Sequence, residues 1–119
     1  MQSSNRDIAS VWDMVQAIRY IQTFTANLSF EAYLNDIRTI SAVERQFEIL
    51  GEAARRISGE FRQAHSAIDW QRIVGLRNIV IHRYDDVNQD VLWTIIQSEL
   101  PPLQTQLESL LPPLPEEQK

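Results

Sequence analysis

The sequence predicts an all-α fold, an antiparallel bundle of four to five helices. Apolar residues recur in several segments at the i, i+3, i+4, i+7 spacing of one buried helical stripe. The 119 residues include only three glycines, and all five prolines lie in the last nineteen positions. Because so few helix breakers precede residue 101, long helices are favoured over many short strands. We expect one domain over residues 1–111 and a proline-rich, acidic, disordered tail over 112–119.

The first half of the chain contains three predicted helices. The first covers about residues 4–26, on an apolar stripe made of Ile8, Val11, Trp12, Val15 and Ile18. After a break at 27–29, Ser29 has the residue type of an N-cap for a short helix over Phe30–Leu34. A long helix is then predicted from about Asp36 to Ser58, and Gly59 stands where a C-cap glycine is expected.

The second half is more often interrupted. The polar segment 59–68 is interpreted as a connector, and Asp69 can cap a helix from Trp70 to about His82. Polar residues at 85–88 indicate a second break, after which Asp86 and Gln89 resemble a capping box. The pair Pro101-Pro102 must either interrupt or kink the helix that begins after this break, or start a final helix, because proline suits a first helical turn.

Composition excludes several classes of function. The absence of cysteine rules out disulfides and thiolate metal sites. No apolar run approaches the length of a membrane span, and the polar N-terminus does not resemble a signal peptide, so we expect a soluble cytoplasmic protein. The net charge is −5, yet the segment 45–83 holds seven arginines against four acidic residues. This basic centre could hold a phosphate group, or it could consist of solvated helix faces.

Two histidines are the first candidates for chemistry. His65 lies in the polar connector and is interpreted as a solvated loop residue. His82 follows an apolar run and stands close to Arg77, Asn78 and Tyr84. Asn78 and His82 are four residues apart and share a helix face. Arg77 and His82 are separated by about 140° on an ideal helix, so they converge only if the helix ends near His82 or the arginine reaches round.

The residues around His82 suit the cleavage of RNA without a metal ion or cofactor. A histidine can exchange a proton with a ribose hydroxyl or a leaving oxygen, and an arginine can bind the phosphate between them. RNA supplies its own nucleophile, so no serine or cysteine is required. A structural alternative is a histidine that stabilises a helix C-terminus.

The segment Arg77-Asn78-Ile79-Val80-Ile81-His82-Arg83-Tyr84 resembles the arginine–x4–histidine–x–tyrosine signature of HepT-like HEPN toxins. The stretch 44–54, with Gly51-Glu52-Ala53, and the segment 70–76 are similar to the same family, so the resemblance covers about residues 6–110. It implies a HEPN-like homodimer that cleaves RNA internally without a metal. It further implies that Arg77 and His82 are catalytic and that Asn78 supports them.

The resemblance also implies a partner, a minimal nucleotidyltransferase that acts as antitoxin by transferring AMP to Tyr84. The added phosphate would pair with Arg77 and block RNA binding. Alternatively, Tyr84 is a half-buried aromatic residue at a helix end.

Gly51 inside a helix predicts a close helix–helix approach, and Glu52 either bonds into the motif or is exposed.

Two other functions stay open. The chain could be a catalytically idle HEPN module that binds and regulates the nucleotidyltransferase, as the acidic net charge would suit. It could also be a plain helical dimerisation domain, which would leave the Arg77–Tyr84 segment unexplained. The complete motif favours the ribonuclease.

Overall fold

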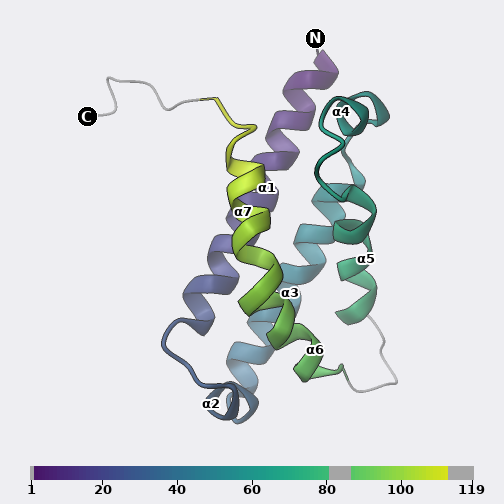
Figure 1. The fold of residues 1–119 in the computed structure, drawn as a ribbon. Coiled ribbons are helices and arrows are strands. Elements are labelled where there is room, and N and C mark those ends of the chain that lie inside the picture. The colour runs from purple at the N-terminus through teal and green to yellow at the C-terminus, as the bar shows by residue number, and fades with distance from the viewer. Residues whose placement is uncertain (1, 81–86, 113–119) are drawn as a thin grey trace, which may run out of the picture.

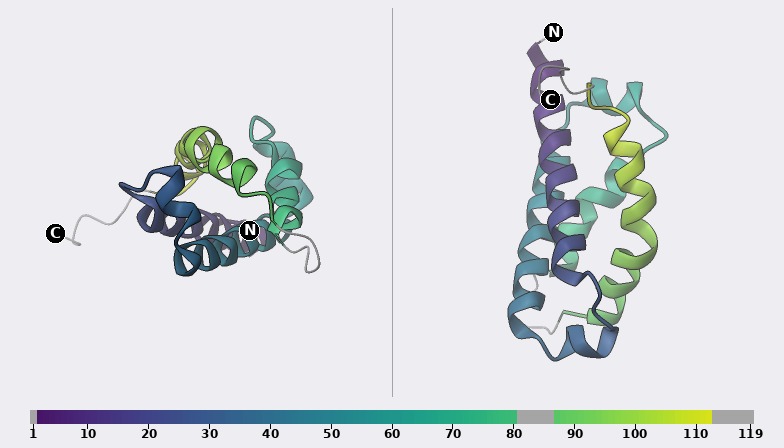
Figure 2. Two further views of the ribbon diagram at one scale, coloured as in Figure 1. Left: turned by 90° about the horizontal axis from the view of Figure 1, so that it is seen from below. Right: turned by 90° about the vertical axis from the view of Figure 1, so that its left-hand side faces the viewer.

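The computed structural model describes residues 2–80 and 87–112. Every regular element in these two ranges is helical, as the sequence predicts. The long elements are α1 (Gln2–Thr25), α3 (Ile37–Arg55), α5 (Trp70–Val80) and a C-terminal run. They alternate in direction and form an antiparallel bundle, with the short helices α2 and α4 at opposite ends (Figures 1 and 2). The predicted fold class is therefore confirmed.

The C-terminal run contains two helices and an unusual junction. Helix α6 (Gln89–Thr94) passes into a π-helical turn, Ile95–Glu99, which leads directly into α7 (Leu100–Glu108). Pro101 and Pro102 lie in the first turn of α7. Proline offers no N–H to the preceding turn, and a π-helical turn shifts the hydrogen-bond register so that the chain continues as a helix. The prolines thus begin a final helix, one of the two predicted outcomes.

Local capping signals predicted several helix starts correctly. Helix α2 spans Phe30–Leu34, and the Ser29 hydroxyl accepts a hydrogen bond from Ala32 N at 3.0 Å. Asp69 accepts one from Arg72 N at 3.1 Å at the start of α5. Asn27, in the predicted break, has a φ of 65°, a left-handed conformation that asparagine tolerates well.

The prediction for Gly59 is wrong. Helix α3 ends at Arg55, and Gly59 is the first residue of α4 (Gly59–Ala64), so the predicted connector contains a helix. Ser58 is the N-cap of α4, because its hydroxyl accepts a hydrogen bond from Phe61 N. The buried Asp7 of α1 holds this cap by accepting hydrogen bonds from Ser58 N at 2.8 Å and from Ser58 Oγ at 2.7 Å.

The predicted capping box before α6 is replaced by another cap. Asn88 is the N-cap, and its side chain accepts a hydrogen bond from Val91 N at 3.3 Å. Asp86 lies outside the described residues. The Gln89 side chain contacts Tyr33 and Glu44, on α2 and α3, so its polar atoms are engaged in tertiary contacts.

The core lies between α1, α3, α5 and the C-terminal run. Its largest fully buried side chains come from all of these elements and from α2, and they include Tyr33, Phe47, Met14, Ile18, Leu50, Ile73, Leu76 and Leu107. Trp12 departs from the predicted stripe of α1, since it is 40% exposed and lies under the Arg19 guanidinium. Among the described helices, none has the length and apolar character needed to cross a membrane.

Candidate active site at the C-terminal end of α5

Arg77 lies in the last turn of α5, where that helix packs on α3. Its Nε is 2.8 Å from Oε2 of Glu52 on α3, and the two side chains are 34% and 38% exposed. The sequence predicts that Glu52 either bonds into the motif or is exposed. The ion pair shows that it contacts the motif through Arg77. Arg77 is thus accessible to a ligand and is held at one point by an acidic partner.

Gly51 brings the two helices together beside Arg77. A Cβ atom placed on Gly51 would lie 2.5 Å from the Cβ of Arg77 and 3.1 Å from its backbone N. A separation of 2.5 Å is far shorter than ordinary van der Waals contact between carbon atoms. Any larger residue would therefore push the backbone of α5, and with it Arg77, away from α3. The close approach predicted for Gly51 is confirmed.

Substituting Gly51 by alanine is expected to destabilise the protein relative to the matched variant Gly75→Ala. Nothing lies within 4 Å of a Cβ at Gly75, a residue of α5 itself. Both variants gain the same helix propensity, so the difference between them measures the cost of overpacking, about 1–3 kcal/mol. Urea denaturation of both variants measures this difference. Equal stabilities would show that α3 and α5 separate there without cost.

Asn78 follows Arg77 on α5 and is exposed. His82 and Tyr84 lie outside the described residues, so their convergence with Arg77 stays a prediction. Helix α5 is described as far as Val80, and the next described helix, α6, begins at Gln89 (Figure 1).

Two partly buried hydrogen bonds anchor the start of α6 to the rest of the bundle. The Tyr33 hydroxyl donates to Gln89 Oε1 at 2.6 Å, and Gln89 Nε2 donates to Glu44 Oε2 at 2.8 Å. Burial, with the nearby Glu44 carboxylate, raises the pKa of Tyr33 well above its usual value, so the phenol stays a donor. These two hydrogen bonds join α2, α3 and the first residue of α6. Sequence reasoning missed them, because the residues that form them are far apart in the chain.

Comparison with known proteins decides the family. The family model described as "Ribonuclease HepT-like" matches residues 14–110, which include Gly51, Glu52 and the whole segment 77–84. The chain belongs to the HepT-like ribonuclease family. The segment that carried the sequence resemblance therefore lies inside the region that the family shares.

Several similar proteins support this membership. A Thermococcus cleftensis protein named "Probable ribonuclease HepT" is 36% identical over 110 residues, covering 92% of this chain and 98% of its own. A Methanocaldococcus jannaschii protein provisionally named an RNase is 33% identical over 106 residues, covering 88% and 97%. A Caldanaerobacter subterraneus protein with a similar provisional name is 34% identical over 98 residues, covering 82% and 88%. No solved structure matches the chain.

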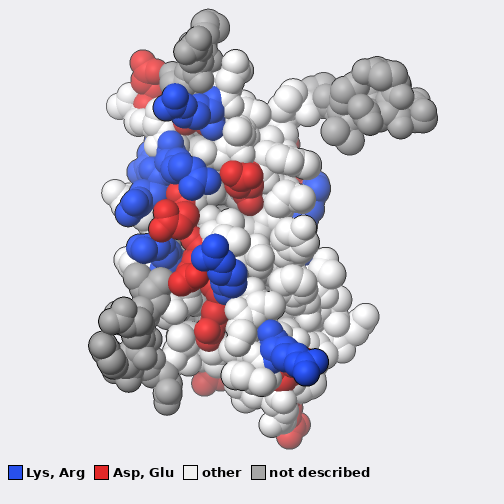
Figure 3. All heavy atoms as spheres, turned by 180° about the vertical axis from the view of Figure 1, so that it is seen from behind, with Lys and Arg blue, Asp and Glu red and all other residues white. Residues whose placement is uncertain are grey.

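Arginines of this HepT-like chain gather along one edge of the face formed by α1 and α3, with acidic side chains between them (Figure 3). Four of the arginines described in the basic centre form ion pairs: Arg45 with Glu48, Arg56 with Asp13, Arg72 with Glu99 and Arg77 with Glu52. Their charges are partly compensated, and the exposed side chains of Arg45, Arg56 and Arg72 agree with solvated helix faces, whereas phosphate binding stays a prediction. Arg77 differs from Arg45 because its acidic partner comes from another helix.

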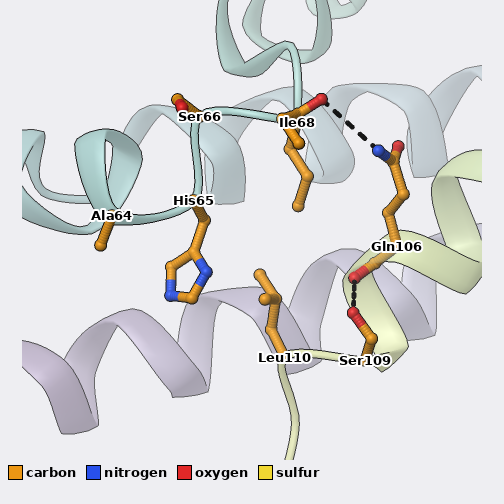
Figure 4. A pocket seen from close by; sticks show the side chains of 8 residues that line it. Ala64, His65, Ser66, Ile68, Gln106, Ser109 and Leu110 are labelled. Atoms are coloured by element: carbon orange, nitrogen blue, oxygen red, sulfur yellow. Dashed lines mark hydrogen bonds between the residues drawn. The ribbon is translucent and has the colours of Figure 1, made fainter.

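His65 follows α4, which lies near the start of α5, whereas Arg77 lies in the last turn of α5 (Figure 1). It is the C-cap of α4, and its ring centroid is 4.4 Å from that of Phe61. It is half-buried and lines an open cavity of about 370 Å³, which Gln106, Ser109 and Leu110 also line (Figure 4). The interpretation of His65 as a solvated loop residue is therefore wrong in part, because Phe61 packs against one side of its ring.

Proposed function

We propose that this chain is a metal-independent endoribonuclease and the toxin of a toxin–antitoxin pair. The observation that carries the proposal is the placement of Arg77, half-exposed in the last turn of α5 and five residues before His82. Membership of the HepT-like ribonuclease family supports it, since the matched region includes both residues. The similar proteins carry ribonuclease names, which support RNA as the substrate.

In the proposed reaction the RNA supplies the nucleophile. His82 takes the proton of a ribose 2′-hydroxyl, and the resulting oxygen attacks the neighbouring phosphorus. The bond from phosphorus to the 5′-oxygen breaks, and that oxygen leaves with a proton returned by the protonated histidine. The products are a 2′,3′-cyclic phosphate and a 5′-hydroxyl. Arg77 binds the non-bridging oxygens, where negative charge builds up in the transition state, and Asn78 supports it. A homodimer would bring two such motifs to one cleft.

Neutralisation is proposed to act on Tyr84. A partner nucleotidyltransferase joins the Tyr84 hydroxyl oxygen to the α-phosphorus of ATP and releases pyrophosphate. The attached AMP brings negative charge within two residues of His82, where it competes with the RNA phosphate for Arg77. The same group is bulky enough to exclude a nucleotide from the cleft.

The second candidate function is a catalytically idle module that binds the nucleotidyltransferase. The ion pair between Arg77 and Glu52 and the net charge of −5 favour it, because both weaken attraction to RNA. The first function remains preferred, since a guanidinium has five N–H donors and the sequence keeps both Arg77 and His82 of the motif.

Expression of the chain in bacteria, alone and with the nucleotidyltransferase, tests the proposal. Expression alone is expected to stop growth, and coexpression is expected to restore it, with one or more AMP units on Tyr84 by mass spectrometry. The Tyr84→Phe variant is expected to stay toxic in the presence of the partner. Growth without arrest would contradict the toxin proposal, and AMP that persists in Tyr84→Phe would contradict the assignment of Tyr84.

A further inference from the structure

Two consecutive residues of α3, Gly51 and Glu52, set the surroundings of Arg77. Gly51 has no Cβ and so lets the backbone of Arg77 approach α3 closely, and Glu52 Oε2 lies 2.8 Å from the guanidinium Nε. An arginine side chain has many rotamers, and a free one would spend little time in any single orientation. The ion pair with Glu52 favours those rotamers that bring Nε beside α3.

We propose that Glu52 is the positioning residue for Arg77, which it holds by Nε so that the terminal nitrogens Nη1 and Nη2 face the scissile phosphate. This inference rests on the proposed ribonuclease function. The contact at 2.8 Å is made to the nitrogen nearest the stem. The two terminal nitrogens form the end-on fork that binds two phosphate oxygens at once. Arg77 can therefore keep its contact with Glu52 while it binds RNA.

Stability alone does not account for this pair. Both side chains are more than one-third exposed, and ion pairs of that kind contribute little to folding because water and salt screen them. Glu48 provides the comparison, since it lies one turn earlier on α3 and pairs with Arg45 at 3.1 Å. That pair lies within one helix, whereas the pair of Glu52 joins α3 to the motif on α5. Of these two glutamates, Glu52 is the one that pairs with a residue that the proposed reaction uses.

The test compares Glu52→Ala, Glu52→Gln and the matched control Glu48→Ala in steady-state cleavage of a labelled single-stranded RNA. Glu52→Ala is expected to lower kcat about 10- to 100-fold with little change in KM, because the orientation matters most when charge develops on the phosphate. Glu52→Gln should retain more activity, since its amide oxygen can still accept a hydrogen bond. Glu48→Ala should behave as wild type, and all variants should unfold at similar temperatures.

A double-mutant cycle separates positioning from an independent effect. In an Arg77→Ala background, Glu52→Ala is expected to cause no further loss, because its only role is to orient the missing side chain. A full additional loss in that background would overturn the proposal. So would kinetics of Glu52→Ala that match those of Glu48→Ala.

A measurement independent of cleavage keeps this inference separable from the proposed function. In nitrogen-15 spectra, the Nε–H signal of Arg77, identified by its loss in Arg77→Ala, should shift in Glu52→Ala but not in Glu48→Ala. An unshifted signal would overturn the positioning role whatever the activity. A shifted signal from a wild-type protein that does not cleave RNA would support the contact and contradict the ribonuclease function.

Discussion

The His82→Ala variant is expected to cleave RNA about 10²–10⁴-fold more slowly than the wild type, the range typical of a lost general acid or base. Alanine can neither take the proton of the 2′-hydroxyl nor return one to the leaving oxygen. The effect should fall on kcat, because substrate binding depends mainly on the phosphate contacts. Single-turnover cleavage of a labelled RNA by the two purified proteins measures it.

His65→Ala is the matched control for this prediction. His65 packs on Phe61 at the end of the bundle away from the motif, so its loss should leave cleavage unchanged. If His65→Ala lost activity and His82→Ala retained it, the cavity beside α4 would become the candidate active site. If both variants cleaved as wild type does, histidine would have no part in the reaction.

Arg77→Ala is expected to lower kcat about 10²–10³-fold, the usual cost of removing one group that stabilises charge in a transition state. Arg77→Lys should recover only part of this loss, because an ammonium group keeps the charge but lacks the planar fork that binds two oxygens. Rates measured for the three proteins over a range of RNA concentrations separate the loss in kcat from any change in KM.

Arg72 supplies the control for Arg77. It also lies on α5 and is ion-paired, with its Nη2 2.6 Å from Glu99 Oε1. Arg72→Ala removes a comparable charge and a comparable pair, so general electrostatic attraction of RNA would affect both variants alike. Equal losses in Arg72→Ala and Arg77→Ala would contradict a specific role for Arg77.

The parts of the fold that depend on neighbouring residues could be predicted from the sequence. Ser29 and Asp69 cap helices through residues three positions away, and a side chain of the right type suffices for that. Gly51 was also informative, because a glycine inside a strong helical pattern indicates a close contact between helices. Which residue it contacts required the structure.

The errors occurred where distant residues decide the local conformation. The cap of α4 combines a local hydrogen bond, from Phe61 N to Ser58 Oγ, with a distant one, because Asp7, 51 residues before Ser58, accepts hydrogen bonds from Ser58. The side chain of Gln89 is engaged by Tyr33 and Glu44, a contact that no spacing rule reveals. The ion pair between Glu52 and Arg77 belongs to the same class, since it depends on the packing of α5 on α3. The motif itself was readable because its members lie within eight residues.

Cleavage of a labelled RNA by the purified wild-type protein in EDTA, after mass spectrometry has shown Tyr84 to be free of AMP, tests the central claim most directly. The account predicts internal cleavage at the same rate with and without the chelator, and products that end in 2′,3′-cyclic phosphate. Intact RNA after incubation with unmodified protein, or cleavage that requires an added metal ion, would contradict a metal-independent ribonuclease.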